Sequence, residues 1–207
     1  MERYFPGTQL RCPIITAEVG NNHEGSLGVA HILLQKAAEA GASLVKFQAG
    51  TAQGFARTPE EIPRYSRYAL GVNNYNLLIH QAERIGIGIF FSVWGESPGF
   101  HILRSREFLK IGARQFGQFL EYDGQKTFVS VPMNWKGEFP YKKATPLHCV
   151  SEYPTSNPRL ERIWSLANYI ERPVGYSDHT IGIEACIEAA KLGAVVIEKH
   201  FTLAHDF

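Results

Sequence analysis

Short apolar runs alternate along the chain with segments whose apolar residues recur at helical spacing. Three such segments predict amphipathic helices over 26–41, 73–86 and 180–193, and each ends in a glycine, the residue that most often follows a helix. The segment 133–144 lacks a helical pattern, so we expect a loop there. The apolar runs are typical of buried strands; they cover 14–20, 43–49, 88–94, 108–113, 127–132, 145–151, 174–180 and 194–203.

Two parts of the chain repeat the same order of helix end, Gly-Ala turn and apolar strand: "AAEAGASLVKFQ" (37–48) and "AAKLGAVVIEKH" (189–200). Such units predict parallel strands joined by crossover helices. Eight of them favour an α/β fold of the (β/α)8, or TIM-barrel, class. An open doubly wound sheet is the alternative, but the chain has no GxGxxG turn. We expect a single domain over 1–207, apparently truncated after the eighth strand, without an eighth helix.

The composition narrows the possible functions. The 207 residues are 44% hydrophobic and 20% charged, with a net charge of +1. This net charge is too small to attract nucleic acid or an anionic membrane surface electrostatically. No run of 18 apolar residues is present to span a bilayer. The N-terminal residues lack the apolar core of a secretion signal. The three cysteines are scattered and lack the spacing of metal-binding or redox motifs. We interpret them as reduced thiols and therefore expect a cytoplasmic protein.

Ionisable residues gather at the ends of the expected strands. Because residues two apart in a strand share a face, Lys46 lies on the face of Gln48, Ser177 on that of His179, and Glu198 on that of His200, whereas Lys199 points the other way. Glu18 and Lys110 end the first and fourth strands. One such charge usually only begins a solvated loop. Recurrence over five strands favours a pocket at the carboxyl ends, where barrel enzymes keep their active sites.

These residue types point to a metal and an anion. Two histidines on adjacent strands suit Mn²⁺, Zn²⁺, Fe²⁺ or Co²⁺, and an ion with open positions polarises a carbonyl oxygen. Two buried lysines, Lys46 and Lys110, need a compensating anion, and a phosphorylated, carboxylated substrate would supply it. Ser130 and Ser177 can donate further hydrogen bonds to such a substrate. Metal-assisted addition to an aldehyde and phosphoester hydrolysis both remain open on this basis.

Four stretches resemble the sialic acid synthase family: "AEVGNNHEG", "GASLVKFQ", "LHCVSEYPT" and "VGYSDHTIGIEACIEAAKLGAVVIEKHFTL". The resemblance runs over roughly 14–203 and is strongest at its two ends, which makes it far more specific than a lone motif. It implies a TIM-barrel transferase of sialic acid biosynthesis. Such an enzyme condenses phosphoenolpyruvate with an N-acetylated amino sugar aldehyde, giving a nonulosonic acid and phosphate. N-acetylmannosamine and related bacterial precursors are the expected acceptors.

The resemblance also assigns roles to residues. The family's two metal-binding histidines, which typically hold Mn²⁺, match His179 and His200, and its sugar-side and metal-side glutamates match Glu18 and Glu198, which we take as catalytic. Gln48, on the strand face of Lys46, and Ser151, where the family often has asparagine, join the expected substrate-binding set. That set comprises Lys46, Gln48, Lys110, Ser130, Ser151, Tyr153 and Ser177.

Three departures from the family pattern bear on activity. Val93 stands where the third strand usually has a threonine near phosphate, and Ala113 replaces a phosphate-binding serine. The family's C-terminal antifreeze-like domain, which lends an arginine to the partner subunit's sugar site, is absent from this sequence. We therefore expect weakened phosphoenolpyruvate binding, and a separate lid subunit is one possible partner. The alternatives are a weak or inactive barrel that binds a sugar or a partner, and a metal-dependent phosphoesterase.

Two further expectations concern surfaces. Without an eighth helix, the outer face of the last strand, around Ile197, would be exposed, so we expect a homodimer or larger homo-oligomer that covers it. The N-terminal segment 1–12 is the alternative cover. In the loop 50–68, Arg57 and Arg64 are candidate contacts to the sugar, although a solvated loop is the more common role for such residues.

Overall fold

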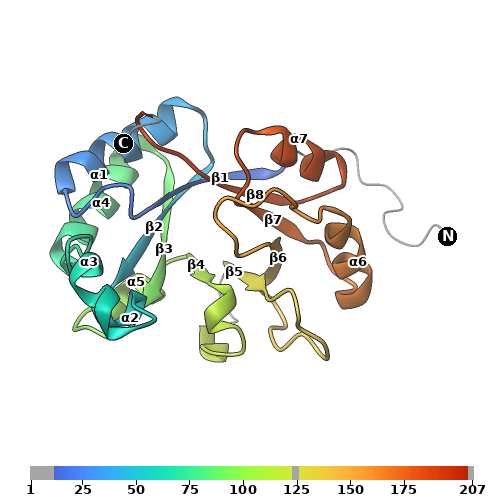
Figure 1. Ribbon diagram of the computed structural model, residues 1–207. Coiled ribbons are helices and arrows are strands. Elements are labelled where there is room, and N and C mark those ends of the chain that lie inside the picture. Colours follow the sequence, from blue (N-terminus) through green and yellow to red (C-terminus); the bar gives the residue numbers. More distant parts are fainter. Residues whose placement is uncertain (1–11, 123–125, 205–207) are drawn as a thin grey trace. The chain divides into compact units, whose positions relative to one another are not determined.

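The eight strands of the chain follow one another in sequence order and close into a parallel barrel (Figure 1), which confirms the TIM-barrel class. The computed structural model describes residues 12–122 and 126–204. The strands are β1 (Ile14–Gly20), β2 (Leu44–Gly50), β3 (Gly88–Trp94), β4 (Phe108–Ile111), β5 (Lys126–Val131), β6 (Thr145–Cys149), β7 (Gly175–Asp178) and β8 (Val196–His200).

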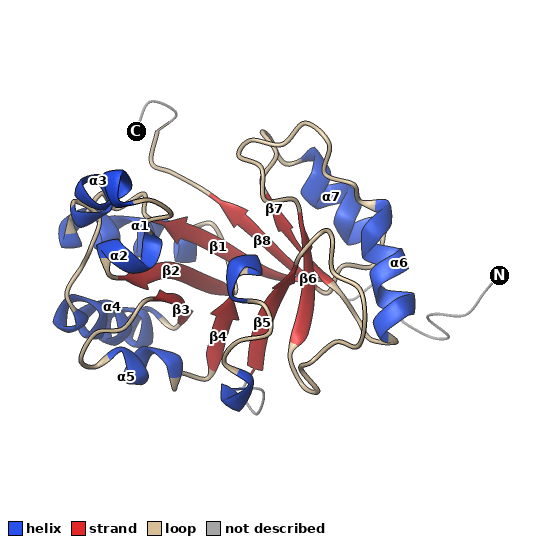
Figure 2. Cartoon of the chain, turned by 60° about the horizontal axis from the view of Figure 1, so that its bottom comes forward, coloured by secondary structure: helices blue, strands red, loops and turns tan. Residues whose placement is uncertain are grey.

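Most of the helices lie in the connections between strands (Figure 2). No helix or strand lies between Val131 and Thr145, as the sequence predicted, and the last helix is shorter than predicted because it begins only at Glu184. The helices are α1 (Leu27–Glu39), α2 (Ala52–Phe55), α3 (Ile62–Ser66), α4 (Val72–Ile85), α5 (Phe100–Arg104), α6 (Glu161–Ile170) and α7 (Glu184–Lys191). Short 3-10 turns are η1 (Pro59–Glu61), η2 (Ala113–Gln115) and η3 (Leu120–Tyr122).

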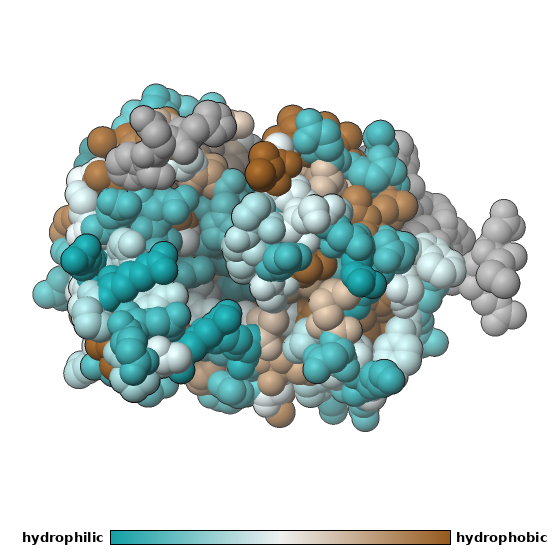
Figure 3. Space-filling model, in the orientation of Figure 1, coloured by the Kyte–Doolittle hydropathy of each residue, from teal (hydrophilic) through white to brown (hydrophobic). Residues whose placement is uncertain are grey.

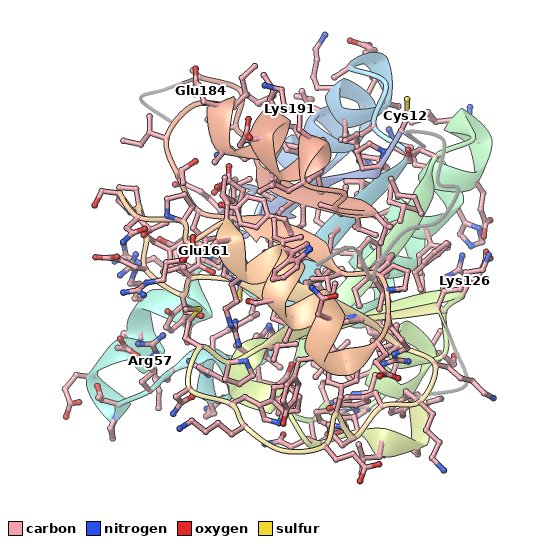
Figure 4. All side chains as sticks on the ribbon, turned by 90° about the vertical axis from the view of Figure 1, so that its right-hand side faces the viewer. Cys12, Arg57, Lys126, Glu161, Glu184 and Lys191 are labelled. Atoms are coloured by element: carbon pink, nitrogen blue, oxygen red, sulfur yellow. The ribbon has the colours of Figure 1, made fainter. Side chains whose placement is uncertain are left out.

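No described helix is long and apolar enough to cross a membrane. In α7, Glu184 and Lys191 are the first and last residues (Figure 4). Their charges complement the partial charges at the two ends of the helix.

The repeated sequence unit forms the same turn twice. After α1, the amide of Gly41 bonds to Ala38 and that of Ala42 to Ala37; after α7, Gly193 bonds to Ala190 and Ala194 to Ala189. Both glycines have positive φ, 83° and 90°, a conformation that costs other residues free energy. The glycine in each repeat is therefore what lets the chain leave the helix and enter the next strand at once.

The chain divides into two compact units. The N-terminal unit comprises residues 16–110 and 200–204, and the C-terminal unit comprises 12–15 and 111–199. In the N-terminal unit, alternate residues of the strands pack under α1 and α4: Val45, Phe47 and Ala49 from β2, and Phe91 and Val93 from β3. The intervening residues of these strands therefore lie on the opposite face of the sheet.

The core of the C-terminal unit joins its last two strands to α6 and α7. Tyr176 of β7 and Ile197 of β8 pack with Ala167 of α6 and Ala189 of α7. Ile197 is 3% exposed, so the expectation of an apolar strip open to water on β8 was wrong at this position: helices of the same unit cover it. The alternative cover, segment 1–12, lies outside the described residues except for Cys12.

Candidate active site

A buried ion pair joins β1 and β2 in the N-terminal unit. Glu18 is 1% exposed and Lys46 is 4% exposed, and the Glu18 carboxylate pairs with the Lys46 ammonium. The two residues are register partners on neighbouring parallel strands. Burial makes each charge costly unless it is compensated, and this ion pair provides the compensation on the strand face opposite the apolar cluster that Val45 and Phe47 join.

Two residues after Lys46 in β2, a row of polar residues crosses β2, β3 and β4. Gln48 is the register partner of Ser92, and Ser92 that of Lys110. Ser92 and Lys110 are buried. The Gln48 side-chain oxygen accepts a hydrogen bond from Asn21 at 3.2 Å. The predicted substrate residues Lys46, Gln48 and Lys110 are thus brought to one sheet face, and Ser92 joins them although the sequence analysis did not single it out.

Gly20, the last residue of β1, lets two functional side chains come close together. A Cβ at this position would lie 3.3 Å from both the Glu18 Oε1 and the His200 Cε1 atoms. Its φ of 57° is also one that side chains disfavour. Phe201, next to His200, donates its amide to the Glu18 carbonyl at 3.3 Å and accepts from Asn22 at 2.7 Å. The predicted metal ligand His200 and the predicted catalytic Glu18 therefore lie side by side.

The C-terminal unit carries a second buried polar pair. Ser177 of β7 and Glu198 of β8 are register partners, and the Ser177 hydroxyl donates to Glu198 Oε1 at 2.8 Å. Both side chains are buried, as is Ser130 of β5. This pair fits the predicted roles of a substrate-contacting serine and a catalytic glutamate.

His179 follows β7 directly, and its ring is held from two sides. The Nδ1 atom lies 2.5 Å from the carbonyl oxygen of Val150. A carbonyl can only accept, so Nδ1 carries the proton and Nε2 carries the lone pair, the arrangement that metal-binding histidines usually have. The Tyr153 ring lies 3.9 Å from the His179 ring, centroid to centroid. Tyr153 itself is 64% exposed, so its ring lies between the imidazole and solvent.

The reverse face of β7 and β8 carries a separate buried network. Lys199 donates to Asp178 Oδ2 at 2.7 Å and to the Thr180 carbonyl at 2.5 Å. Tyr176 and Cys186 also donate to Asp178, at 2.8 and 3.1 Å. Burial alone would raise the pKa of Asp178, but these donors outweigh it and the pKa is lowered. Burial and the neighbouring carboxylate raise the pKa of Cys186 to about 12, which leaves an unreactive thiol.

Several expected site residues lie elsewhere. Val93 belongs to the apolar cluster under the helices, so the expectation that it lines the anion site was wrong; alternation along β3 puts Ser92 on that face instead. Ala113 lies in the turn η2 after β4. Ser151 is exposed beyond the end of β6, with Cys149 at 4.0 Å as a weak contact.

The two loop arginines remain at the surface. Arg57 and Arg64 are exposed, and Figure 4 shows Arg57 projecting away from the ribbon. Both have local contacts: the Arg57 amide donates to Glu61 at 2.6 Å, and the Arg64 guanidinium lies 6.0 Å from the centre of the Tyr65 ring.

Each of the two histidines is a candidate metal ligand within its own unit. Within the described ranges, no three His, Cys, Asp or Glu side chains converge closely enough to hold a metal ion by themselves. Taken singly, His179 has the tautomer that metal-binding histidines usually have, and His200 lies near the Glu18 carboxylate within its own unit. All three cysteines, Cys12, Cys149 and Cys186, are free thiols, as expected.

A family model and curated relatives with about 30% identity point to one family. The model of the NeuB family matches residues 134–207. N,N'-diacetyllegionaminic acid synthase from Legionella pneumophila is 30% identical over 95% of this chain and 65% of its own length. Human N-acetylneuraminate-9-phosphate synthase is also 30% identical, over 95% of this chain and 64% of its own length. The chain thus spans slightly less than two thirds of these curated relatives.

A solved structure extends the likeness to three dimensions. The N-acetylneuraminic acid synthetase of Leptospira borgpetersenii, crystallised with citrate, superposes with a TM-score of 0.86 at 30% identity. The match covers 94% of this chain and 75% of that one.

Proposed function

Because the chain belongs to the NeuB family, we propose that it condenses phosphoenolpyruvate with an N-acetylated amino sugar aldehyde, giving a nonulosonic, sialic-type acid and phosphate. The observation that carries this proposal is the buried Glu18–Lys46 ion pair that joins β1 and β2. Ionisable groups with strongly perturbed surroundings, such as a buried ion pair, cluster at active sites. The related synthases act on different sugars by their names, so the acceptor is proposed only as a class.

The residues divide by role. Lys46 and Lys110 supply positive charge for the phosphate and carboxylate of phosphoenolpyruvate. Glu18 serves the sugar side, where it moves a proton: its Oε1 atom has no hydrogen-bond partner within the described part of the chain. Glu198, held by Ser177, serves the metal side. The remaining substrate contacts are assigned to Gln48, Ser130, Ser151, Tyr153 and Ser177.

His179 and His200 would hold the divalent ion, for which we propose Mn²⁺. The pairing of β7 with β8 runs as far as Asp178 and Lys199, the residues directly before these two histidines. When bound, the ion supplies Lewis acidity for the aldehyde carbonyl. The imidazoles contribute neutral nitrogen ligands, and the Val150 carbonyl holds His179 in the required tautomer.

The atoms of the reaction balance without any further reactant except water. C3 of phosphoenolpyruvate forms the new bond to the aldehyde carbon, and the aldehyde oxygen takes up a proton. Water adds to C2, and phosphate leaves. Two acid–base groups are therefore needed, which matches the two buried carboxylates Glu18 and Glu198.

An assay with phosphoenolpyruvate, Mn²⁺ and a panel of N-acetylated hexosamines tests the proposal. We expect phosphate release that requires the sugar, with an equal amount of nine-carbon acid detected by mass spectrometry. Phosphate release without any sugar would instead indicate a phosphoesterase. Binding of both substrates without turnover would indicate the weak or inactive barrel, or an enzyme that needs a lid subunit. A cytoplasmic location is part of the proposal.

Metal binding provides a second prediction. The variant His179→Ala/His200→Ala should lose its bound Mn²⁺, because too few ligands remain for a stable site. Metal analysis after dialysis measures this. His80→Ala/His101→Ala, which removes two histidines of the N-terminal unit outside the proposed site, is the matched control. Equal metal content in the two variants would contradict the assignment of His179 and His200.

A further inference from the structure

We propose that Ser92 donates a hydrogen bond to an oxyanion of phosphoenolpyruvate, and that the Trp94 indole positions it. The inference deepens the proposed function and rests on it. Ser92 is not among the residues that the family resemblance assigned. It emerges from the strand register alone, which places it between Gln48 and Lys110.

The face that Ser92 occupies is fixed by its neighbours. Phe91 and Val93, on either side of it, both pack in the apolar cluster beneath the helices. Successive residues of a strand alternate between faces, so Ser92 lies on the face of Gln48 and Lys110. It is buried, and its position next to a buried lysine is where an anion would be held.

The Ser92 hydroxyl is oriented by an internal donor. Trp94 Nε1 donates to Ser92 Oγ at 3.3 Å. An indole N–H can only donate, so the serine oxygen accepts here and its own proton remains for a second partner. Ser92 can therefore donate to a further partner, which is the polarity that phosphate or carboxylate requires.

The Trp94 backbone is itself fixed by close packing. Its carbonyl accepts the Thr51 amide at 3.0 Å. A Cβ on Gly54 would come within 2.4 Å of that carbonyl group, so only glycine allows α2 to lie against the end of β3. The Phe55 ring of α2 lies 6.4 Å from the Trp94 ring. The indole is thus a rigid support for the serine.

Titration calorimetry with phosphoenolpyruvate on the full chain and on Ser92→Ala tests the inference. We expect about a tenfold loss of affinity, the value for a hydrogen bond to a charged group. Trp94→Phe keeps an aromatic ring but removes the donor, and should weaken binding less. Ser92→Thr, which restores a hydroxyl, should recover most of the affinity. Val93→Thr is the matched control: its hydroxyl faces the helices, so affinity should not rise.

Parallel titrations with inorganic phosphate and with pyruvate identify the oxyanion. A loss confined to phosphate assigns Ser92 to the phosphoryl group, and a loss confined to pyruvate assigns it to the carboxylate. If Ser92 had only a structural role, Ser92→Ala would not weaken the affinity for one of these ligands more than for the other. If Ser92→Ala does not fold by circular dichroism, Trp94→Phe decides in its place.

The titrations distinguish a wrong role for Ser92 from a wrong proposed function. If the parent chain binds phosphoenolpyruvate and Ser92→Ala binds it equally well, Ser92 has no such role while the proposed function stands. If the parent chain binds no phosphoenolpyruvate, both fall together.

Discussion

At the scale of single residues, His23 shows how burial sets protonation in this chain. Its side chain is fully buried, and Nδ1 accepts the Gly25 amide at 3.1 Å. The ring must therefore be neutral with its proton on Nε2. Burial lowers the pKa of His23 to about 4, because a charged imidazole would lose its hydration.

This depressed pKa predicts a pH-dependent stability. In the unfolded chain His23 titrates near its ordinary value of about 6.5. Its contribution is therefore fully present above that pH and is lost as pH falls toward 4, since the unfolded state then binds the extra proton. Between pH 7 and pH 5 the free energy of unfolding should fall by about 2 kcal/mol through this group.

Urea denaturation at the two pH values measures the effect. His23→Asn keeps an acceptor for the Gly25 amide but does not titrate. Between pH 7 and pH 5 its free energy of unfolding should therefore fall by about 2 kcal/mol less than that of the parent. His80→Asn, at an exposed position of α4, is the control and should retain the slope of the parent. An unchanged slope in His23→Asn would show that another group carries the pH dependence.

At the scale of elements, the reverse face of β7 and β8 shows what ties the last strands to α7. Asp178 is buried and receives hydrogen bonds from β7, from α7 and from Lys199 of β8. The Lys199–Asp178 contact thus fixes the two strands whose next residues are His179 and His200. Ser177 and Glu198 form the corresponding pair on the other face.

Removing the lysine should therefore destabilise the fold strongly. Lys199→Met leaves the Asp178 carboxylate buried without its cation, at a cost of about 3 kcal/mol. The double variant Asp178→Asn/Lys199→Met should recover part of this loss, because no buried charge remains. The surface pair of Lys191 with Glu188 at 3.2 Å is the control: Lys191→Met should change stability by less than about 1 kcal/mol. Urea titrations of all four proteins decide; equal losses in Lys199→Met and Lys191→Met would rule out this role.

At the scale of the whole molecule, the oligomeric state remains a prediction, but its basis changes. Ile197 is covered within the C-terminal unit, so it is not the patch that a second copy would cover. Exposed apolar residues occur instead before and within α7, at Ile181, Ile183 and Ile187. Figure 3 shows brown, apolar atoms in this region. Patches of this kind on a protein surface often mark interfaces.

We expect light scattering at micromolar concentration to give a mass above the 23.2 kDa of one chain, with two-fold contacts through the α7 patch. Ile183→Asp/Ile187→Asp should shift the protein toward monomer while leaving it folded. Ile197→Asp should instead unfold it, because a carboxylate would enter the core. A parent protein that scatters as a monomer would refute the expected assembly.

The sequence by itself determined the fold class and proposed the candidate site residues. Apolar strands alternating with amphipathic helices specify a parallel barrel because each element must bury one side, and the repeated Gly-Ala turns mark where strands begin. Strand periodicity also placed Lys46 and Gln48 on one face of their strand, and Glu198 and Lys199 on opposite faces of theirs. It could do so because the alternation of side chains is a local property of a strand. The ordered motifs at both ends of the chain were specific enough to identify the family.

Only the tertiary structure decided which residues meet across strands. The register between β2, β3 and β4 placed Ser92 between Gln48 and Lys110, and no property of an isolated strand reveals that offset. Alternation along β3 shows that Val93 points away from Ser92, but only the packing shows that the face of Val93 is the one under the helices. Three other features also depend on the tertiary structure. They are the cover of Ile197 by α6 and α7, the closeness of Glu18 and His200 at Gly20, and the Lys199–Asp178 contact. Each joins residues far apart in the chain, so it depends on packing distances that the sequence pattern does not contain.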